Sequence, residues 1–381
     1  MKTYLILVVI FFFITCQENY QAYDSTSLSA EQASKLKEKL YLDYKKGILS
    51  KRSKEMTDQV ITINNRKIKF DLQFFGKKAT NGWSLFISLH GGGGTTEEKN
   101  TIYWNRHKTL YELDNGILFT PRSPTNTWNM WHQSHVDTFF NRIIQNMIAF
   151  HEVDPNRVYI MGRSAGGDGI YQIAPRMADR FAAAAMSAGH PNEASPLGLR
   201  NIAFAIHMGE NDYLYDRNKV AIQWENQLAE LRKNDPGGYR HFVKIYKDKG
   251  HWMDNLEASA LIWMSDFVRK PYPDKIIWKQ DDVLHKRFYW LKNEDPTIGD
   301  LIEAEITDQV INIKNSSSSS LIIQLNDDFI DLNKKVVVNY QHIELFNGFV
   351  SRNIKVIERS LKEYGDPYGI YYGEIHLSLA K

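Results

Sequence analysis

The chain has 381 residues, of which 43% are hydrophobic and 24% are charged. This length exceeds that of one typical domain and favours two, and the composition excludes a chain that is disordered throughout. The 47 basic and 45 acidic residues give a net charge of +2, so charge provides no basis for binding nucleic acid.

The N-terminal residues predict an export signal. An unbroken apolar run covers residues 4–14, which is too short for a membrane-spanning helix and fits a signal peptide. The run leads to Cys16, the only cysteine, and "FITC" resembles the lipobox of bacterial lipoproteins. Thr15 is larger than the residue usual there, which leaves a plain secretory signal or an uncleaved anchor as alternatives. We expect residues 1–16 to be removed or acylated at Cys16, and the protein to be anchored by lipid in the periplasm or on the outer cell surface.

Residues 17–57 form an N-terminal segment in which the spacing of Leu36, Leu40 and Tyr44 predicts an amphipathic helix over 30–46. Two β-rich runs follow, and Asn64-Asn65 between them indicates a hairpin.

From there to about residue 270, apolar strand-like runs alternate with helical ones. The strand candidates are "WSLFISLH", "GILFTPRS", "RVYIMG", "AAAAMSAG", "IAFAIHMG" and "HFVKIYKDK". Such alternation predicts an α/β fold, in which helices cover both faces of a mostly parallel sheet. Residues 58–270 are therefore expected to form one domain, with its active site at the carboxyl ends of the strands.

The pattern changes after "RKPYPDK", where short β-like runs dominate and one helical segment, "SRNIKVIERSLKEYG", interrupts them. We expect residues 271–381 to form an accessory β-sandwich-like domain that contributes no catalytic group. The serine run at 316–320 is expected at a hairpin tip. Aromatic residues near the junction predict extensive docking onto the preceding domain.

The most informative motif is Gly162-Arg163-Ser164-Ala165-Gly166, which fits G-x-S-x-G between a predicted strand and a predicted helix. Glycines on both sides allow a sharp turn to close, and such a turn exposes its serine as a nucleophile. The alternative is a glycine-rich turn with an incidental serine.

A glycine loop, "LHGGGG" at 89–94, follows another predicted strand. Acyl transfer needs backbone N–H groups directed at a developing oxyanion. We expect the N–H groups near Gly91 and Gly92, together with that of Ala165, to supply them.

Two more residues follow strand ends in the order that a serine, an acid and a histidine take in this kind of sheet. Asp212 comes three residues after Gly209, and Asp216 is its nearest competitor. His251 follows the last predicted strand. Asp212 would orient His251, which would activate Ser164.

With these motifs, residues 58–270 resemble the α/β-hydrolase fold. "HGGGG", "GRSAGG", "GEND" and "GHW" are similar to segments of esterases, polyhydroxybutyrate depolymerases and prolyl-oligopeptidase-type catalytic domains. The resemblance implies a serine hydrolase without a cofactor, and we expect one that cleaves small-molecule or polymer esters, acylated carbohydrates among them. A peptidase and a non-catalytic binding protein on a hydrolase fold stay open as alternatives.

Four further residues are candidates for lining a substrate pocket: Trp128, Trp131, Trp252 and His190. Each has packing of its own loop as the alternative. His132 and His135 are three residues apart, but no carboxylate stands at a metal-motif spacing, so we expect no metal site.

Overall fold

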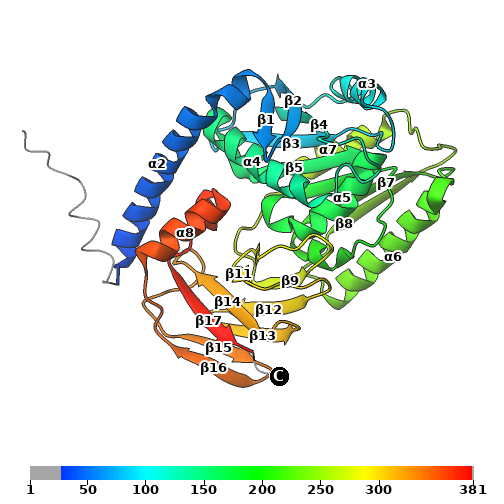
Figure 1. Ribbon diagram of the computed structural model, residues 1–381. Helices are drawn as coiled ribbons and strands as arrows, with labels where there is room; N and C mark the ends of the chain where they lie inside the picture. Colours follow the sequence, from blue (N-terminus) through cyan, green and yellow to red (C-terminus); the bar gives the residue numbers. More distant parts are fainter. Residues whose placement is uncertain (1–26, 380–381) are drawn as a thin grey trace, which may run out of the picture.

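The computed structural model describes residues 27–379, so Cys16 and the expected signal peptide lie outside the described residues. Its largest sheet has eight strands in the order β1-β2-β4-β3-β5-β6-β7-β8, and Figure 1 shows this sheet above the strands of the C-terminal part. Its strands are β1 (Val60–Ile63), β2 (Arg66–Phe75), β3 (Trp83–Leu89), β4 (Gly116–Arg122), β5 (Val153–Arg163), β6 (Ala183–Ser187), β7 (Ala203–Gly209) and β8 (His241–Tyr246).

The edge of this sheet is the predicted hairpin. β1 and β2 pair antiparallel, with Ile63 opposite Arg66 and a two-residue turn between them. Asn64 and Asn65 have φ angles of 48° and 64°, which asparagine tolerates better than most residues. β2 is also antiparallel to β4, and every later pair in the sheet is parallel. The mostly parallel α/β sheet predicted from the sequence is confirmed.

Both faces of the sheet are covered by helices, as its continuous apolar strands require. The helices are α3 (Glu97–His107), α4 (Ser134–His151), α5 (Ala165–Arg176), α6 (Arg217–Asn234) and α7 (Ser259–Ser265). Alternate residues of β5 point to opposite faces of the sheet. On one face, Val158 and Ile160 pack in the core with α4, α5 and α6. Tyr159 and Met161 pack on the opposite face with α7.

The C-terminal part contains two further sheets and a helix, α8 (Ile354–Tyr364). One sheet has the order β10-β11-β14-β17 and the other β16-β15-β13-β12-β9. Their strands are β9 (Lys275–Lys279), β10 (Arg287–Phe288), β11 (Leu291–Lys292), β12 (Leu301–Thr307), β13 (Val310–Ser316), β14 (Ser320–Leu325), β15 (Val336–Tyr340), β16 (Ile343–Gly348) and β17 (Gly373–Ser378).

The serine run at 316–320 is not the predicted hairpin tip. It joins β13 to β14, which belong to different sheets. The hydroxyl of Ser316 donates to the carbonyl of Ser318 and accepts from the N–H of Ser318, which turns the chain from one sheet to the other. Local composition identified the turn but not the strands that it connects.

The two parts of the chain share a continuous hydrophobic core. Trp278 and Trp290 belong to the same cluster of buried residues as the core between α5 and the main sheet. The hydroxyl of Tyr289 donates to the carbonyl of Ala178 across the junction, at 3.0 Å. The docking predicted from the junction aromatics is therefore extensive, while the division of the chain at residue 270 stays a prediction.

A buried group of charges also crosses this junction. Asp366 lies 3.2 Å from Arg180 and 2.8 Å from Arg269, and no side chain of the three is more than 3% exposed. Burial alone would raise the pKa of Asp366, but the two guanidinium groups, Arg269 foremost, outweigh it and hold this pKa below its ordinary value.

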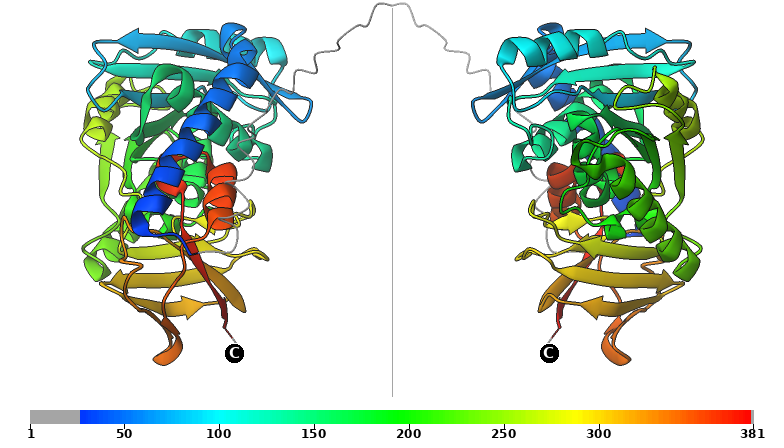
Figure 2. Two further views of the ribbon diagram at one scale, coloured as in Figure 1. Left: turned by 90° about the vertical axis from the view of Figure 1, so that its left-hand side faces the viewer. Right: turned by 90° about the vertical axis from the view of Figure 1, so that its right-hand side faces the viewer.

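The N-terminal helix α2 (Ala30–Thr57) extends beyond the predicted 30–46 and connects both parts (Figure 2). Near one end, Lys37 pairs with Asp328 of the C-terminal part at 2.9 Å. Near the other end, Glu55 pairs with Arg142 of α4 at 2.6 Å. Among residues 27–379, no helix combines the length and apolar character needed to cross a bilayer.

Replacement of Asp366 by alanine should lower the free energy of unfolding by about 3–5 kcal/mol, because it leaves two arginines buried without their carboxylate. Chemical denaturation would measure the change. Asp43→Ala is the matched control, since Asp43 makes an exposed pair with Lys46 and should cost less than about 1 kcal/mol. Equal losses in the two variants would contradict the stabilising role of the buried group.

Candidate active site

Ser164 stands on a sharp turn between β5 and α5. Its backbone angles are φ 56° and ψ −123°, a conformation that costs energy in a residue with a side chain. The turn closes because its neighbours are small: a Cβ on Gly162 would lie 2.3 Å from the carbonyl oxygen of Gly166. The N–H of Ser164 donates to the carbonyl of Ser187 at 2.9 Å, which secures the turn to β6.

The structure brings Ser164, His251 and Asp212 together. His251 Nε2 lies 2.9 Å from Ser164 Oγ, and His251 Nδ1 lies 2.8 Å from Asp212 Oδ2. Asp212 follows β7 and its side chain is 1% exposed, whereas the side chain of His251 is 43% exposed. A buried carboxylate thus contacts one nitrogen of the imidazole, and the other nitrogen reaches the serine.

The competing carboxylate, Asp216, does not take part in this contact. Its side chain is 64% exposed and pairs with Lys219 at 2.8 Å. Tyr215 and Asp216 both have left-handed backbone angles, with φ of 58° and 53°, and lead into α6. The oxygen of Asp212 that does not contact His251, Oδ1, lies 3.9 Å from Arg217 Nη1.

The glycine loop after β3 lies beside Ser164. A Cβ on Gly91 would come within 3.1 Å of the Cβ of Ser164. Gly92 has φ 119°, and a Cβ there would lie 2.2 Å from the side-chain oxygen of Asn100, so only glycine fits. The same oxygen accepts from the N–H of Gly93 at 2.8 Å and fixes the loop.

The N–H groups of Gly92 and Ala165 have no hydrogen-bond acceptor within residues 27–379. Ala165 is the first residue of α5, where backbone N–H groups lack partners inside the helix. The structure therefore leaves donors free next to the serine hydroxyl.

Esterases are among the known proteins that are similar to this chain. No family model matches the chain. A bifunctional acetylxylan esterase/xylanase of Neocallimastix patriciarum is 26% identical over 193 residues, which cover 46% of this chain and 28% of that protein. The chain thus spans less than a third of this relative's length.

Three solved structures show the same similarity. A thermostable esterase is 19% identical with a TM-score of 0.44, over 56% of this chain and 64% of its own. A poly(3-hydroxybutyrate) depolymerase from Bordetella parapertussis is 14% identical with a TM-score of 0.38, over 54% and 87%. An acetyl xylan esterase from Aspergillus awamori is 14% identical with a TM-score of 0.37, over 54% and 98%.

The order of the strands and the placement of the site on them decide the fold. Ser164 follows β5, Asp212 follows β7, His251 follows β8, and the glycine loop follows β3, all at the carboxyl edge of one sheet. The chain has the α/β-hydrolase fold.

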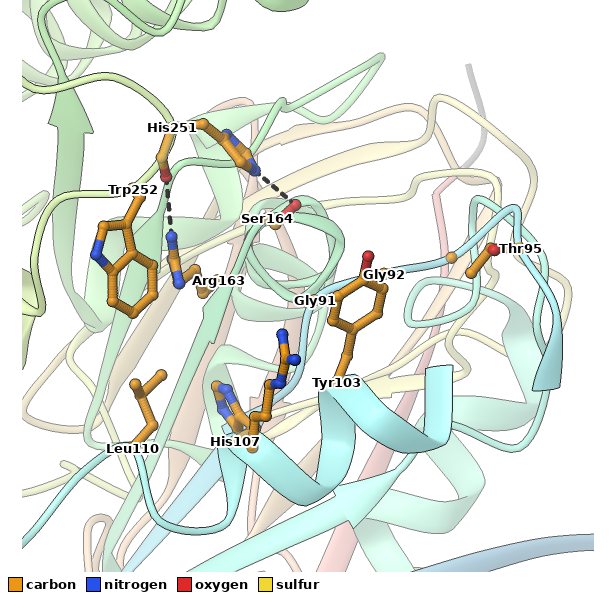
Figure 3. A pocket seen from close by; sticks show the side chains of 12 residues that line it. Gly91, Gly92, Thr95, Tyr103, His107, Leu110, Arg163, Ser164, His251 and Trp252 are labelled. Carbon is orange, nitrogen blue, oxygen red and sulfur yellow. Dashed lines mark hydrogen bonds between the residues drawn. The ribbon is translucent and has the colours of Figure 1, made fainter. Parts of the chain in front are cut away.

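Two hollows meet at Ser164. The larger, of about 650 Å³, is lined by both Ser164 and His251 and extends towards α3. Figure 3 shows Tyr103 and His107 rising from α3 opposite Ser164 and His251. The smaller, of about 540 Å³, lies on the side of Ala165 and Asp168.

Three of the four pocket candidates line these hollows. Trp252 lines the larger one, and Trp128 and His190 line the smaller. Trp131 is the exception and corrects our expectation: it is fully buried, and its indole N–H donates to the carbonyl of His90 at 2.8 Å. Trp131 therefore supports the glycine loop from beneath.

The sequence did not indicate several other residues that line the two hollows: Tyr103, Arg106, Leu110, Tyr215 and Arg217. A usable signal existed for the first two, because α3 follows the glycine loop directly and residues three apart share a helix face.

Arg163, the residue before the serine in the motif, connects the turn to the loop that carries His251. Its Nη2 donates to the carbonyl of His251 at 3.1 Å, and its guanidinium lies 3.8 Å from the centre of the Trp252 ring. Glu257, fully buried, balances its charge at 3.6 Å. These contacts hold the segment that carries His251.

One group of acidic side chains within residues 27–379 has oxygen atoms that lie within 4.8 Å of one another, as a metal ion would require: Glu193, Asp281 and Asp282. None of the three lines the hollows beside Ser164.

Two buried histidines support the site in their neutral form. His90 lies between the carbonyl of Gly91, at 2.7 Å from Nδ1, and the N–H of Ser123, at 3.1 Å from Nε2. His107 Nε2 lies 2.9 Å from Ser88 Oγ. Burial lowers the pKa of each histidine to about 3.

Because these histidines take up protons near pH 6.5 only when the chain unfolds, the free energy of unfolding should fall as the pH drops from 6.5 towards 3. Each histidine should contribute about 1 kcal/mol between pH 6.5 and 5.5. Urea denaturation at the two pH values would measure the loss. His107→Gln should reduce the pH dependence, and an unchanged dependence in that variant would contradict the assignment.

Proposed function

We propose that this protein hydrolyses carboxylic esters with Ser164 as nucleophile, His251 as general base and acid, and Asp212 as the orienting carboxylate. The observation that carries the proposal is the pair of hydrogen-bond distances at His251, 2.9 Å to Ser164 and 2.8 Å to Asp212. The same arrangement activates serine in hydrolases of unrelated folds.

The reaction would proceed in two steps. Ser164 Oγ attacks the ester carbonyl carbon, its proton passes to His251 Nε2, and the carbonyl electron pair moves to oxygen. Collapse of this intermediate breaks the bond to the alcohol, which leaves with the proton from Nε2. Water then attacks the acyl-enzyme in the same way, and it releases the acid and restores Ser164.

The carbonyl oxygen gains negative charge in both steps, and the backbone N–H groups of Gly91, Gly92 and Ala165 would stabilise it. Their lack of other acceptors within the described residues supports this role. Donors that are fixed before the reaction stabilise the transition state without the cost of reorganisation. The contact between Gly93 and Asn100 supplies that rigidity.

The similar proteins also suggest a substrate class, which we propose here. The names of the similar proteins include acetylxylan esterases and a depolymerase of a polyester. We propose acylated carbohydrates as substrates, and the exposed aromatic side chain of Trp128 at the smaller hollow is suited to stack on a sugar ring. A panel of acetylated and feruloylated sugars would test this assignment.

Ser164→Ala should abolish hydrolysis of a small activated ester and covalent labelling by a fluorophosphonate, with a loss in kcat on the order of 10⁴-fold or more. Circular dichroism would check that the variant is folded. An amide of the same acyl group, measured in parallel, would separate an esterase from a peptidase. Activity of the variant within tenfold of wild type would rule out Ser164 as the nucleophile.

A pair of carboxylates provides the matched control for this prediction. Asp212→Asn should lower kcat by several orders of magnitude, because the amide would favour the wrong tautomer of His251. Asp216→Asn should leave kcat near the wild-type value, since Asp216 faces solvent and Lys219. The reverse order would identify Asp216 as the orienting carboxylate.

We also propose that the protein is exported and anchored to a membrane through a lipid on Cys16. The support is the apolar run at 4–14 that leads to the only cysteine of the chain. Several acyl chains give firm anchoring, because each buried CH₂ contributes roughly 0.8 kcal/mol.

Intact-mass analysis of the mature protein should therefore find Cys16 as the first residue, with acyl chains attached. Cys16→Ser should release the protein from the membrane fraction or block its maturation. A mature protein that starts after Cys16 and carries no lipid would show that the segment is an ordinary secretory signal.

A further inference from the structure

The larger hollow beside Ser164 carries an excess of positive charge. Two arginines, Arg106 and Arg163, line it, and none of its lining residues within the described chain is acidic. His107 adds no charge near neutral pH, because burial lowers its pKa to about 3. Apart from His251, the two guanidinium groups therefore determine the charge of this hollow.

The charge of Arg163 is already balanced. Its Nε lies 3.6 Å from the carboxylate of Glu257, which is fully buried behind it. Its Nη2 donates to the carbonyl of His251, and its guanidinium packs on the ring of Trp252 (Figure 3). Arg163 thus serves the protein's own structure.

Arg106 is different. It lies in the last turn of α3, and among residues 27–379 its guanidinium has no carboxylate within 4.0 Å and donates no hydrogen bond. A cation at a helix C-terminus is favourable by itself. That effect explains a basic residue in this turn, but it does not require the side chain to line the hollow that contains Ser164.

The smaller hollow provides a contrast within the same site. It contains one acidic and one basic residue, Asp168 and Arg217. Arg217 lies 3.9 Å from Asp212, so its charge also has a partner. The unbalanced positive charge is therefore confined to the side of the site that α3 and His251 form.

We propose that the substrate carries a carboxylate in addition to its scissile ester, and that Arg106 binds this carboxylate in the larger hollow. The inference rests on the proposed function, because the hollow is a substrate site only if Ser164 is the nucleophile. A guanidinium matches a carboxylate with two parallel hydrogen bonds. Arg106 is exposed to solvent where it lines the hollow, so its guanidinium is accessible to a bound substrate, and Tyr103 and Leu110 provide apolar surface in the same hollow.

Two pairs of esters test the proposal, and each pair consists of a charged carboxylate and its neutral methyl ester. The first pair places the charge on the alcohol side: 4-acetoxybenzoate and its methyl ester. The second pair places the charge on the acyl side: mono-4-nitrophenyl adipate and its methyl ester. Release of nitrophenolate measures the hydrolysis of both. In each pair the ratio of kcat/KM for the charged ester to that for the neutral ester measures selectivity for the anion.

In at least one pair, Arg106→Gln should lower this ratio about tenfold, since it removes a charge-assisted contact. Arg106→Lys should restore part of it. Added salt should lower the wild-type ratio as well. Lys99→Gln is the matched control: it removes the same charge from α3, does not line the hollow, and should leave both ratios unchanged.

Ratios that are the same for wild type and Arg106→Gln in both pairs would overturn the proposal. So would an equal fall in Lys99→Gln, because the effect would then arise from net charge alone. The outcome is distinguishable from failure of the proposed function. If the proposed function itself were wrong, the wild-type protein would hydrolyse none of the four esters and would not react with a fluorophosphonate.

Discussion

The close approach of the first turn of α5 to the ends of β3 and β5 determines the geometry of the site. A Cβ on Gly166 would lie 2.3 Å from the carbonyl oxygen of Leu89, so a larger residue would push the helix away from the sheet. Because the helix stays close, Ser164 contacts the glycine loop, its hydroxyl reaches His251, and the first N–H of α5 lies free beside it. The strained backbone of Ser164, with its positive φ, is maintained by this packing and by its hydrogen bond to β6.

Much of this arrangement is readable in the sequence because it depends on short-range rules. Apolar runs that alternate with helical ones predict the parallel sheet, and the motif predicts the turn at Ser164. In such a sheet the residues after successive strands gather at one edge, so the positions of Asp212 and His251 follow from their distance to strand ends.

Contacts between distant parts of the chain are not readable in this way. Trp131 turns inward because a carbonyl of the neighbouring strand end accepts its N–H, which no local pattern reveals. The pairing of Arg163 with Glu257, and the lack of a partner for Arg106, also depend on how loops fold back. The serine run failed as a predicted hairpin for the same reason: its composition indicates a turn, whereas the sheet that each neighbouring strand joins depends on the rest of the C-terminal part.

The C-terminal part supports the helix that carries the serine turn. Asp137 of α4 pairs with Arg176 at the end of α5 at 2.7 Å and lies 2.8 Å from His285 of the C-terminal part. Side-chain polar contacts through Asp137 thus connect α5 to a residue beyond the main sheet. This part supplies none of the residues that line the two hollows beside Ser164 within the described chain, yet it stabilises the framework on which they stand.

The position of α2 has a consequence for synthesis of the chain. The N–H of Leu28 donates to the carbonyl of Arg352, so the segment that enters α2 contacts a residue made much later. At about 5–20 residues per second, a ribosome needs on the order of 15–65 s to add the roughly 320 residues between them. Until Arg352 is made, the start of α2 lacks this contact, whereas the other end of the helix can already pair with Arg142 of α4.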